Sequence, residues 1–258
     1  MKFKNFTSKL IDHKVIGTDI YFEENKNSLY VRMKRSPFKI KVPTKLDVSI
    51  SYLTGVIIGD GNITLIPREL SKYPRTKIKI YNSSEQFINN INYLFKEIFN
   101  YAGKLWKKKD KNCFVLEINN KIVYSYFVNI IGLKPRKKIN LRVPNLIKTK
   151  KLFKYFFAGL MDTDGFYTNK TFGIMMNGTN EMFLEEIKHL SNKFHNLKFL
   201  NPVLSECRLN DKTFKRVQMN LSRYSVSGFW KIIPLKNEKW VRPDLNRGSS
   251  PNLQQSPI

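Results

Sequence analysis

The sequence predicts an α+β fold made of two pseudo-symmetric halves, each with the element order αββαββα. The first observation is an internal repeat, in which Lys-Ile-Lys-Val-Pro (39–43) precedes Tyr-Leu-Thr-Gly-Val-Ile-Ile-Gly-Asp-Gly (52–61), and Asn-Leu-Arg-Val-Pro (140–144) precedes Phe-Phe-Ala-Gly-Leu-Met-Asp-Thr-Asp-Gly (156–165). The second is that strand-like and amphipathic helical segments follow each copy in the same order. Hydrophobic residues make up 41% of the chain and aromatic residues 13%, which is enough for a folded core.

The first half continues with a strand-like segment over 75–81 and an amphipathic helix that begins at a capping box of Ser83 and Gln86. A β-hairpin with arms 104–109 and 113–118 follows, and a short helix over 121–131 ends before Gly132. The inward face of the amphipathic helix is predicted to contain Phe87, Ile91, Leu94, Phe95 and Ile98.

The second half repeats this order with a strand over 172–176, a helix, and a hairpin that turns near Asn210-Asp211 and returns over 213–221. A last helix covers 225–233. The inward residues of the first of these helices are predicted to be Met182, Ile187, Leu190 and Phe194. We therefore divide the chain into an N-terminal extension (1–37), a first repeat (38–138), a second repeat (139–240) and a disordered tail (241–258) that is rich in Pro, Ser, Asn and Gln. Within the extension, Asp19–Tyr21 and Ser28–Met33 have the pattern of a hairpin.

Charge is the strongest guide to the partner. Lys and Arg total 46 against 20 Asp and Glu, which gives a net charge of +26. Such an excess favours a polyanion, either nucleic acid or an anionic membrane surface. No apolar run approaches the ~20 residues of a membrane helix, and the first residues lack the apolar core of a signal peptide. With two cysteines and no CxxC spacing, we expect an intracellular protein in reducing conditions, neither secreted nor bound to a membrane.

Strand periodicity indicates which sheet faces meet the partner. Ile78 and Ile80 alternate with basic residues in the first half, as Val217 and Met219 alternate with polar residues in the second. Arg, Lys, Gln and Asn are side chains that read base edges in a DNA groove, although a solvated polar face explains the same alternation. The predicted DNA-binding residues are Arg75, Lys77, Lys79, Lys107, Lys109, Arg208, Arg216, Gln218 and Asn220.

The two repeated apolar segments are predicted to be helices that pack closely. Gly55/Gly59 and Gly159/Thr163 are i, i+4 pairs, which leave a stripe of small residues on each helix. If the helices are parallel, Asp60 and Asp164 meet at their negative ends and repel each other unless cations intervene. Oxygen ligands without a His or Cys cluster favour Mg²⁺ over Zn²⁺. In a protein built to hold a polyanion, this suggests phosphodiester hydrolysis by metal-activated water.

These residues resemble the two motif copies of the LAGLIDADG homing endonucleases, whose double-motif members are monomeric and cut DNA. The resemblance covers about residues 38–240 and implies motif helices at the domain interface, with two saddle-shaped antiparallel sheets in the major groove of a long duplex site. It assigns the divalent cation, Mg²⁺, to Asp60 and Asp164 at the eighth motif position and to the carbonyls of Gly59 and Thr163. It also implies a basic catalytic residue near each site. The candidates are Lys137 or Lys138 at the end of the first repeat and Lys236 or Lys239 at the end of the second, of which we select Lys138 and Lys236.

The sequence departs from the family pattern at three positions. Ile58 replaces the sixth-position acid, Phe157 replaces the first-position Leu, and Thr163 is bulkier than the usual Ala or Gly. Because both eighth-position acids are present, a metal-dependent DNA endonuclease is the preferred interpretation. The alternative is an intron RNA maturase or a non-cleaving DNA-binding protein derived from the same fold, whose partner would be host intron RNA or DNA alone.

Overall fold

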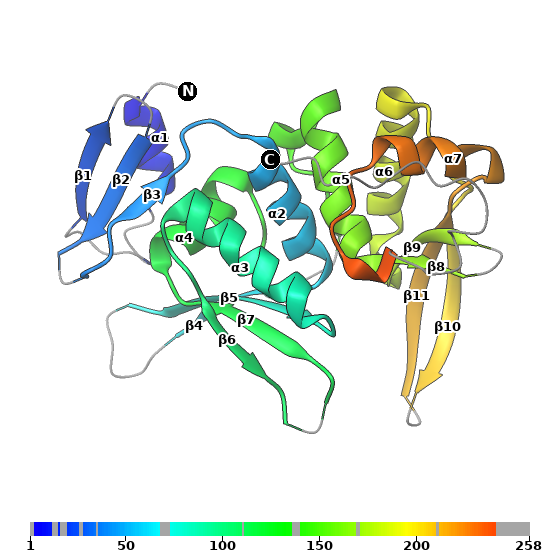
Figure 1. The fold of residues 1–258 in the computed structure, drawn as a ribbon, viewed down its shortest axis with the longest axis horizontal. Coiled ribbons are helices and arrows are strands. Elements are labelled where there is room, and N and C mark those ends of the chain that lie inside the picture. The colour runs from blue at the N-terminus through cyan, green and yellow to red at the C-terminus, as the bar shows by residue number, and fades with distance from the viewer. Residues whose placement is uncertain are drawn as a thin grey trace.

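The computed structural model describes residues 3–11, 15, 20–25, 28–34, 36–67, 73–109, 111–135, 140–168, 171–209 and 212–240. Two long helices, α2 (Val48–Gly59) and α5 (Lys150–Asp164), lie side by side at its centre (Figure 1). Both begin at a side-chain cap, since Asp47 accepts from the Ile50 N–H at 2.9 Å and Thr149 accepts from the Leu152 N–H at 3.4 Å. Helix α2 is apolar all round and buried from residue 50 to 59, as expected of a helix enclosed by its neighbours.

Each motif helix leads into a four-stranded antiparallel sheet, and the two sheets have the same strand order. The first sheet is ordered β4-β5-β7-β6 and the second β8-β9-β11-β10, so each motif helix is followed by an edge strand. The strands are β4 (Gly61–Ile66), β5 (Arg75–Asn82), β6 (Lys104–Lys107), β7 (Phe114–Ile118), β8 (Gly165–Tyr167), β9 (Phe172–Asn177), β10 (Val203–Leu209) and β11 (Lys212–Asn220). The predicted α+β fold with two repeat-like halves is confirmed.

The remaining helices pack on the sheets, on the side of the motif helices (Figure 1). They are α3 (Glu85–Phe99), α4 (Lys121–Ser125), a π-helical turn (Tyr126–Ile131), α6 (Glu181–His195) and α7 (Arg223–Ile232). Gly132 follows the π-helical turn at φ +91°, a left-handed conformation that glycine adopts without strain. Among the described residues, no helix is both long enough and apolar enough to span a membrane.

Two local predictions are wrong. The N-cap of α3 is Ser84 rather than Ser83, because Ser84 is extended and its Oγ accepts from the Phe87 N–H at 3.0 Å. Met182 is 62% exposed, since the buried stripe of α6 runs through Phe183, Ile187 and Leu190, and Met182 lies one residue, or about 100°, off that stripe.

The N-terminal extension contains the predicted hairpin, β1 (Ile20–Asn25) with β2 (Ser28–Met33), beside helix α1 (Phe3–Leu10). The hairpin gains a third strand, β3 (Ile40–Val42), from residues that we assigned to the first repeat. Asp19, the turn at Asn210-Asp211 and the tail 241–258 lie outside the described residues.

Candidate metal centre and nucleic-acid interface

The motif helices pack with their backbones almost in contact. A Cβ at Gly55 would overlap the Phe156 carbonyl and lie 2.8 Å from the Leu160 nitrogen, and a Cβ at Gly159 would overlap the Tyr52 carbonyl. Further along, Gly59 faces Thr163, whose hydroxyl bonds back to the Leu160 carbonyl at 2.9 Å. Gly55 meets Phe156 and Leu160, and Gly59, one turn later, meets Thr163. Because the contacts move in the same chain direction on both helices, the helices are parallel. The small-residue stripes therefore act as predicted, and Thr163 fits because Gly59 has no side chain.

Parallel packing brings the Asp60 and Asp164 ends together. A Cβ at Gly59, next to Asp60 in the chain, would lie 3.3 Å from Asp164 Oδ2. Both aspartates are half-buried and so remain open to solvent. Asn82 Nδ2 donates to Asp60 Oδ2 at 2.7 Å, while Asn82 Oδ1 accepts from the Ser84 N–H at 2.9 Å. The start of α3 thus orients the amide that holds Asp60.

The donors at this point fit a hard divalent cation. Two carboxylates and nearby helix-end carbonyls are oxygen ligands of the kind that Mg²⁺ and Ca²⁺ take. The part of the chain that the structure describes contains no group of three or more His, Cys, Asp or Glu side chains that could hold an ion alone. A cation bound by Asp60 and Asp164 would therefore complete its coordination with water or substrate oxygens, as Mg²⁺ commonly does.

Lys239 brings a positive charge to the same point. Its Nζ donates to the Thr163 carbonyl and to the Gly165 carbonyl, both at 2.9 Å. Desolvation lowers the pKa of the Lys239 ammonium, against the attraction of Asp162, Asp60 and Asp164. Lysine at a helix C-terminus stabilises the exposed carbonyls there.

Lys236, our selected catalytic residue, points elsewhere. Its ammonium lies over the Tyr52 ring, 5.0 Å from the centroid, and burial lowers its pKa against the attraction of Asp162 and Glu97. The structure therefore brings Lys239, the other candidate, to the two carboxylates. Lys138 lies outside the described residues.

The sixth-position acid of the second motif, Asp162, is fully buried. Burial raises its pKa to about 6, although hydrogen bonds from Tyr52, Lys236 and Asn237 and the charge of Lys239 act in the opposite direction. The same burial, with Asp162 beside the hydroxyl, raises the pKa of Tyr52. This carboxylate faces protein on all sides, so it is no candidate for contact with substrate.

The polar face of the first sheet carries the predicted cations around an acid that the sequence analysis did not identify. Glu117, on β7, accepts from Lys77 Nζ at 2.6 Å and from Lys79 Nζ at 3.2 Å, and Arg75 lies at 4.0 Å. Burial opposes ionisation of Glu117, but Lys77 and Lys79 outweigh it and lower its pKa. Lys79 also lies over the Trp106 ring, 5.7 Å from the centroid. Lys107 and Lys109 are exposed at the hairpin.

The polar face of the second sheet shows the predicted alternation, because Val217 and Met219 are fully buried while the residues between them are half-exposed. Gln218 Nε2 donates to Asn220 Oδ1 at 2.8 Å, which aligns the two amides, and Arg216 lies against Met175. Of Arg208 only the backbone in β10 is described.

Comparison with known proteins supports the resemblance. Residues 47–132 match the family model of a LAGLIDADG-like domain. A glutamine–fructose-6-phosphate aminotransferase of Methanocaldococcus jannaschii is 27% identical over 60% of this chain, and a component of the A-type ATP synthase of Pyrococcus abyssi is 25% identical over 84%. The chain spans only 13% and 21% of those two proteins, and their named activities differ from each other. Neither named activity is therefore transferred to this chain.

Two solved structures of the homing endonuclease I-DmoI share the fold. Mesophilic variants of I-DmoI match with a TM-score of 0.54 at 22% identity, over 72% of this chain and 94% of that one. I-DmoI in complex with DNA and Mn matches with a TM-score of 0.53 at 21% identity, over 72% and 97%. The match thus spans nearly all of I-DmoI and extends beyond the part that the family model covers. Residues 47–132 of this chain thus match a LAGLIDADG-like domain, and the chain as a whole shares the fold of I-DmoI.

Proposed function

We propose that this chain is a monomeric, site-specific endonuclease for double-stranded DNA, with Mg²⁺ or a similar divalent cation held by Asp60 and Asp164. The observation that carries the proposal is the meeting of these two carboxylates at the ends of closely packed parallel helices. A cation bound there would activate water and stabilise charge on a phosphate. The carbonyls of Gly59 and Thr163 are the proposed additional ligands.

The sheets support duplex DNA as the substrate. They extend on either side of the motif helices (Figure 1), and each has a polar face with predicted contact residues. Lys77, Lys79 and Arg216 supply positive charge and hydrogen-bond donors for phosphates and base edges. With a net charge of +26, binding should weaken steeply as salt increases.

The test begins by selecting duplexes from a randomised library in the presence of Ca²⁺. The selected duplexes are then incubated with the protein and Mg²⁺, Mn²⁺ or EDTA, and all new ends are sequenced. The proposal predicts metal-dependent ends at one long recurrent site. The matched control is the double variant Asp60→Asn, Asp164→Asn, which should bind the same duplex and produce no ends.

Other outcomes would contradict the proposal. Tight duplex binding without metal-dependent ends would indicate a non-cleaving DNA-binding protein. Binding to intron RNA alone would indicate the maturase alternative. Ends that persist in the double variant would show that the two carboxylates do not hold the catalytic cation.

A further inference from the structure

Asp162 is a buried carboxylate that the proposed chemistry does not use, yet it has an unusually full set of partners. Its Oδ2 accepts from the Tyr52 hydroxyl at 2.6 Å and from the Lys236 N–H at 2.8 Å, and its Oδ1 accepts from the Asn237 N–H at 3.1 Å. Hydrogen bonds to a charged group are among the stronger ones in proteins. The carboxylate thus fixes the backbone of residues 236–237 against helix α5, 74 positions away in the chain.

Asn237 extends this connection to the metal centre. Its Nδ2 donates to the Asp162 carbonyl at 2.9 Å, and its Oδ1 accepts from the Lys239 N–H at 3.0 Å. The turn that this bond stabilises sends the Lys239 side chain to the Thr163 carbonyl. Trp240 anchors the far side of the turn, 7% exposed and 5.2 Å from the Phe172 ring, centroid to centroid. The contacts run from Asp162 through Asn237 to Lys239.

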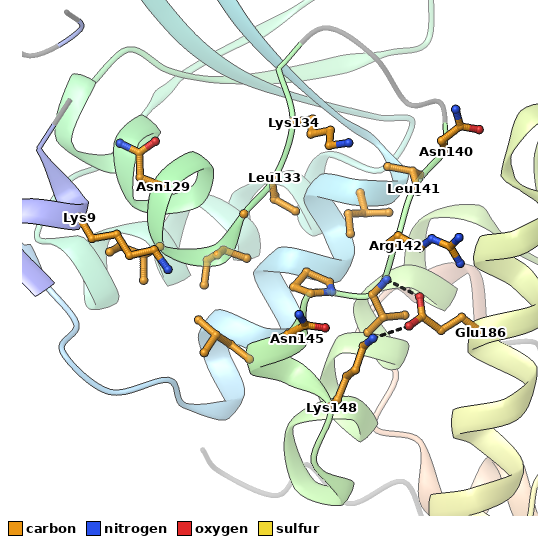
Figure 2. A pocket seen from close by; sticks show the side chains of 17 residues that line it. Lys9, Asn129, Leu133, Lys134, Asn140, Leu141, Arg142, Asn145, Lys148 and Glu186 are labelled. Atoms are coloured by element: carbon orange, nitrogen blue, oxygen red, sulfur yellow. Dashed lines mark hydrogen bonds and ion pairs between the residues drawn. The ribbon is translucent and has the colours of Figure 1, made fainter. Parts of the chain in front are cut away.

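The described part of the first half has no carboxylate at the position of Asp162. The position that corresponds to Asp162 is Ile58, and it lines a cleft of about 640 Å³. Leu133 and Lys134, which follow the π-helical turn of the first half, line the same cleft (Figure 2). An isoleucine cannot accept the hydrogen bonds that hold Lys236 and Asn237 in the second half. The hydrogen bonds that hold residues 236–237 therefore have no side-chain acceptor at the corresponding position of α2.

We propose that Asp162 is a positioning residue, which holds the 236–240 segment so that Lys239 stands at the Thr163 carbonyl beside Asp164. Through Lys239 it acts at the Asp164 end, so its loss should slow the cut of one DNA strand more than that of the other. The effect on the strands rests on the proposed function, whereas the position of Lys239 does not.

The first test is chemical labelling of lysine amines on the DNA-free protein, read by mass spectrometry. Lys239 and Lys231, a lysine on α7, are both exposed, but Lys239 Nζ donates to two carbonyls, so Lys239 should label more slowly than Lys231. Asp162→Asn keeps the size of the side chain but presents an NH₂ to at least one backbone N–H, so the segment should detach and Lys239 should label about tenfold faster. Asn237→Ala should do the same while leaving the Asp162 carboxylate in place, which covers the case in which Asp162→Asn does not fold. The matched control is Ile58→Val at the corresponding position, which should change nothing at Lys239.

The second test uses the duplex identified above, with each strand labelled. Asp162→Asn should slow the cleavage of one strand about tenfold more than the other, so that nicked DNA accumulates. A purely structural loss would slow both strands equally and would overturn the positioning role. Equal labelling of Lys239 and Lys231 in the unsubstituted protein, or unchanged labelling in both variants, would overturn the proposal whether or not the chain cuts DNA.

Discussion

The two halves of the molecule are alike where their motif helices touch and different where those helices end. Gly55 and Gly159 make equivalent close approaches to the partner backbone. At the ends, Asp60 is held by the Asn82 amide, whereas the carbonyl beside Asp164 is held by the Lys239 ammonium. Gly61 pairs with Ile80, and Gly165 pairs with Ile174 at the corresponding place in the second sheet. Asn82 and Met176, each two residues further along, therefore correspond to each other. The Met176 side chain has no hydrogen-bond donor for an aspartate.

The difference shows which part of a duplicated fold is constrained by packing. Backbone contact between the helices leaves no space for a side chain, so both copies must keep small residues there. The polar groups around Asp60 and Asp164 come from other segments, and these can diverge as long as each end keeps a hydrogen-bond donor. Substitutions in either region test this difference between packing and polar contacts.

The largest effect is expected when either carboxylate loses its charge. If the two halves perform the same chemistry on opposite strands, Asp60→Asn and Asp164→Asn should each reduce cleavage about a thousandfold, or about 4 kcal/mol of barrier. Duplex affinity should remain within a few-fold, because the sheets are untouched. Single-turnover cleavage and equilibrium binding of the same duplex measure both effects. Lost binding or lost folding in either variant would contradict a role limited to the cation.

The next largest effect is expected at the helix interface and should be equal in the two copies. Gly55→Ala and Gly159→Ala each place a methyl group on a backbone carbonyl, which cannot move away, so the free energy of unfolding should fall by about 3 kcal/mol in each. Urea titration followed by circular dichroism measures it. Gly228→Ala in α7 is the control: its Cβ would lie 3.7 Å from Leu197 Cδ2, an ordinary contact, and alanine should stabilise the helix by up to about 1 kcal/mol. A clear difference between the two interface variants would show that the packing is not equivalent.

The features that could be predicted from the sequence are those set by local periodicity. The glycine stripes, the alternation of Ile78 and Ile80 with lysines, and the terminal aspartates all follow from spacing within one element, and all lie as predicted. The choice between Lys236 and Lys239 depends on how a distant segment folds back onto Asp162, which spacing does not show. The alternation of residues along β7 places Glu117 on the polar face, but its position between Lys77 and Lys79 depends on the register of β5 with β7.

A smaller effect is expected at Asn82, and it tests the asymmetry from the first half. Asn82→Ala removes the hydrogen bond to Asp60 and should cost about 1.5 kcal/mol, or about tenfold, in the cleavage of one strand. The affected strand should be the one that Asp162→Asn leaves less affected. Met176→Ala at the corresponding position is the control and should not alter the ratio between strands. If Asn82→Ala and Asp162→Asn slow the same strand, the assignment of one partner to each half is wrong.

The smallest effect is expected on the first sheet, at Glu117. Glu117→Gln removes the carboxylate from between Lys77 and Lys79, so duplex affinity should rise by about fivefold at low salt, or about 1 kcal/mol.

The same variant has a pH-dependent effect on stability. Because Lys77 and Lys79 lower the pKa of Glu117, its ion pairs contribute stability above the ordinary pKa of glutamate. That stability is lost as pH falls through the lowered value, so the stability difference between Glu117→Gln and the unsubstituted protein should shrink below about pH 4.

The control for affinity is Glu206→Gln, which makes the same charge change on β10. Glu206 pairs with Lys215, on the face of the second sheet opposite to that of Arg216, so this variant should alter affinity less. The measurement is duplex affinity as a function of salt for the unsubstituted protein, Glu117→Gln and Glu206→Gln. An equal gain in both variants would mean that net charge alone, and not the face of the first sheet, determines affinity.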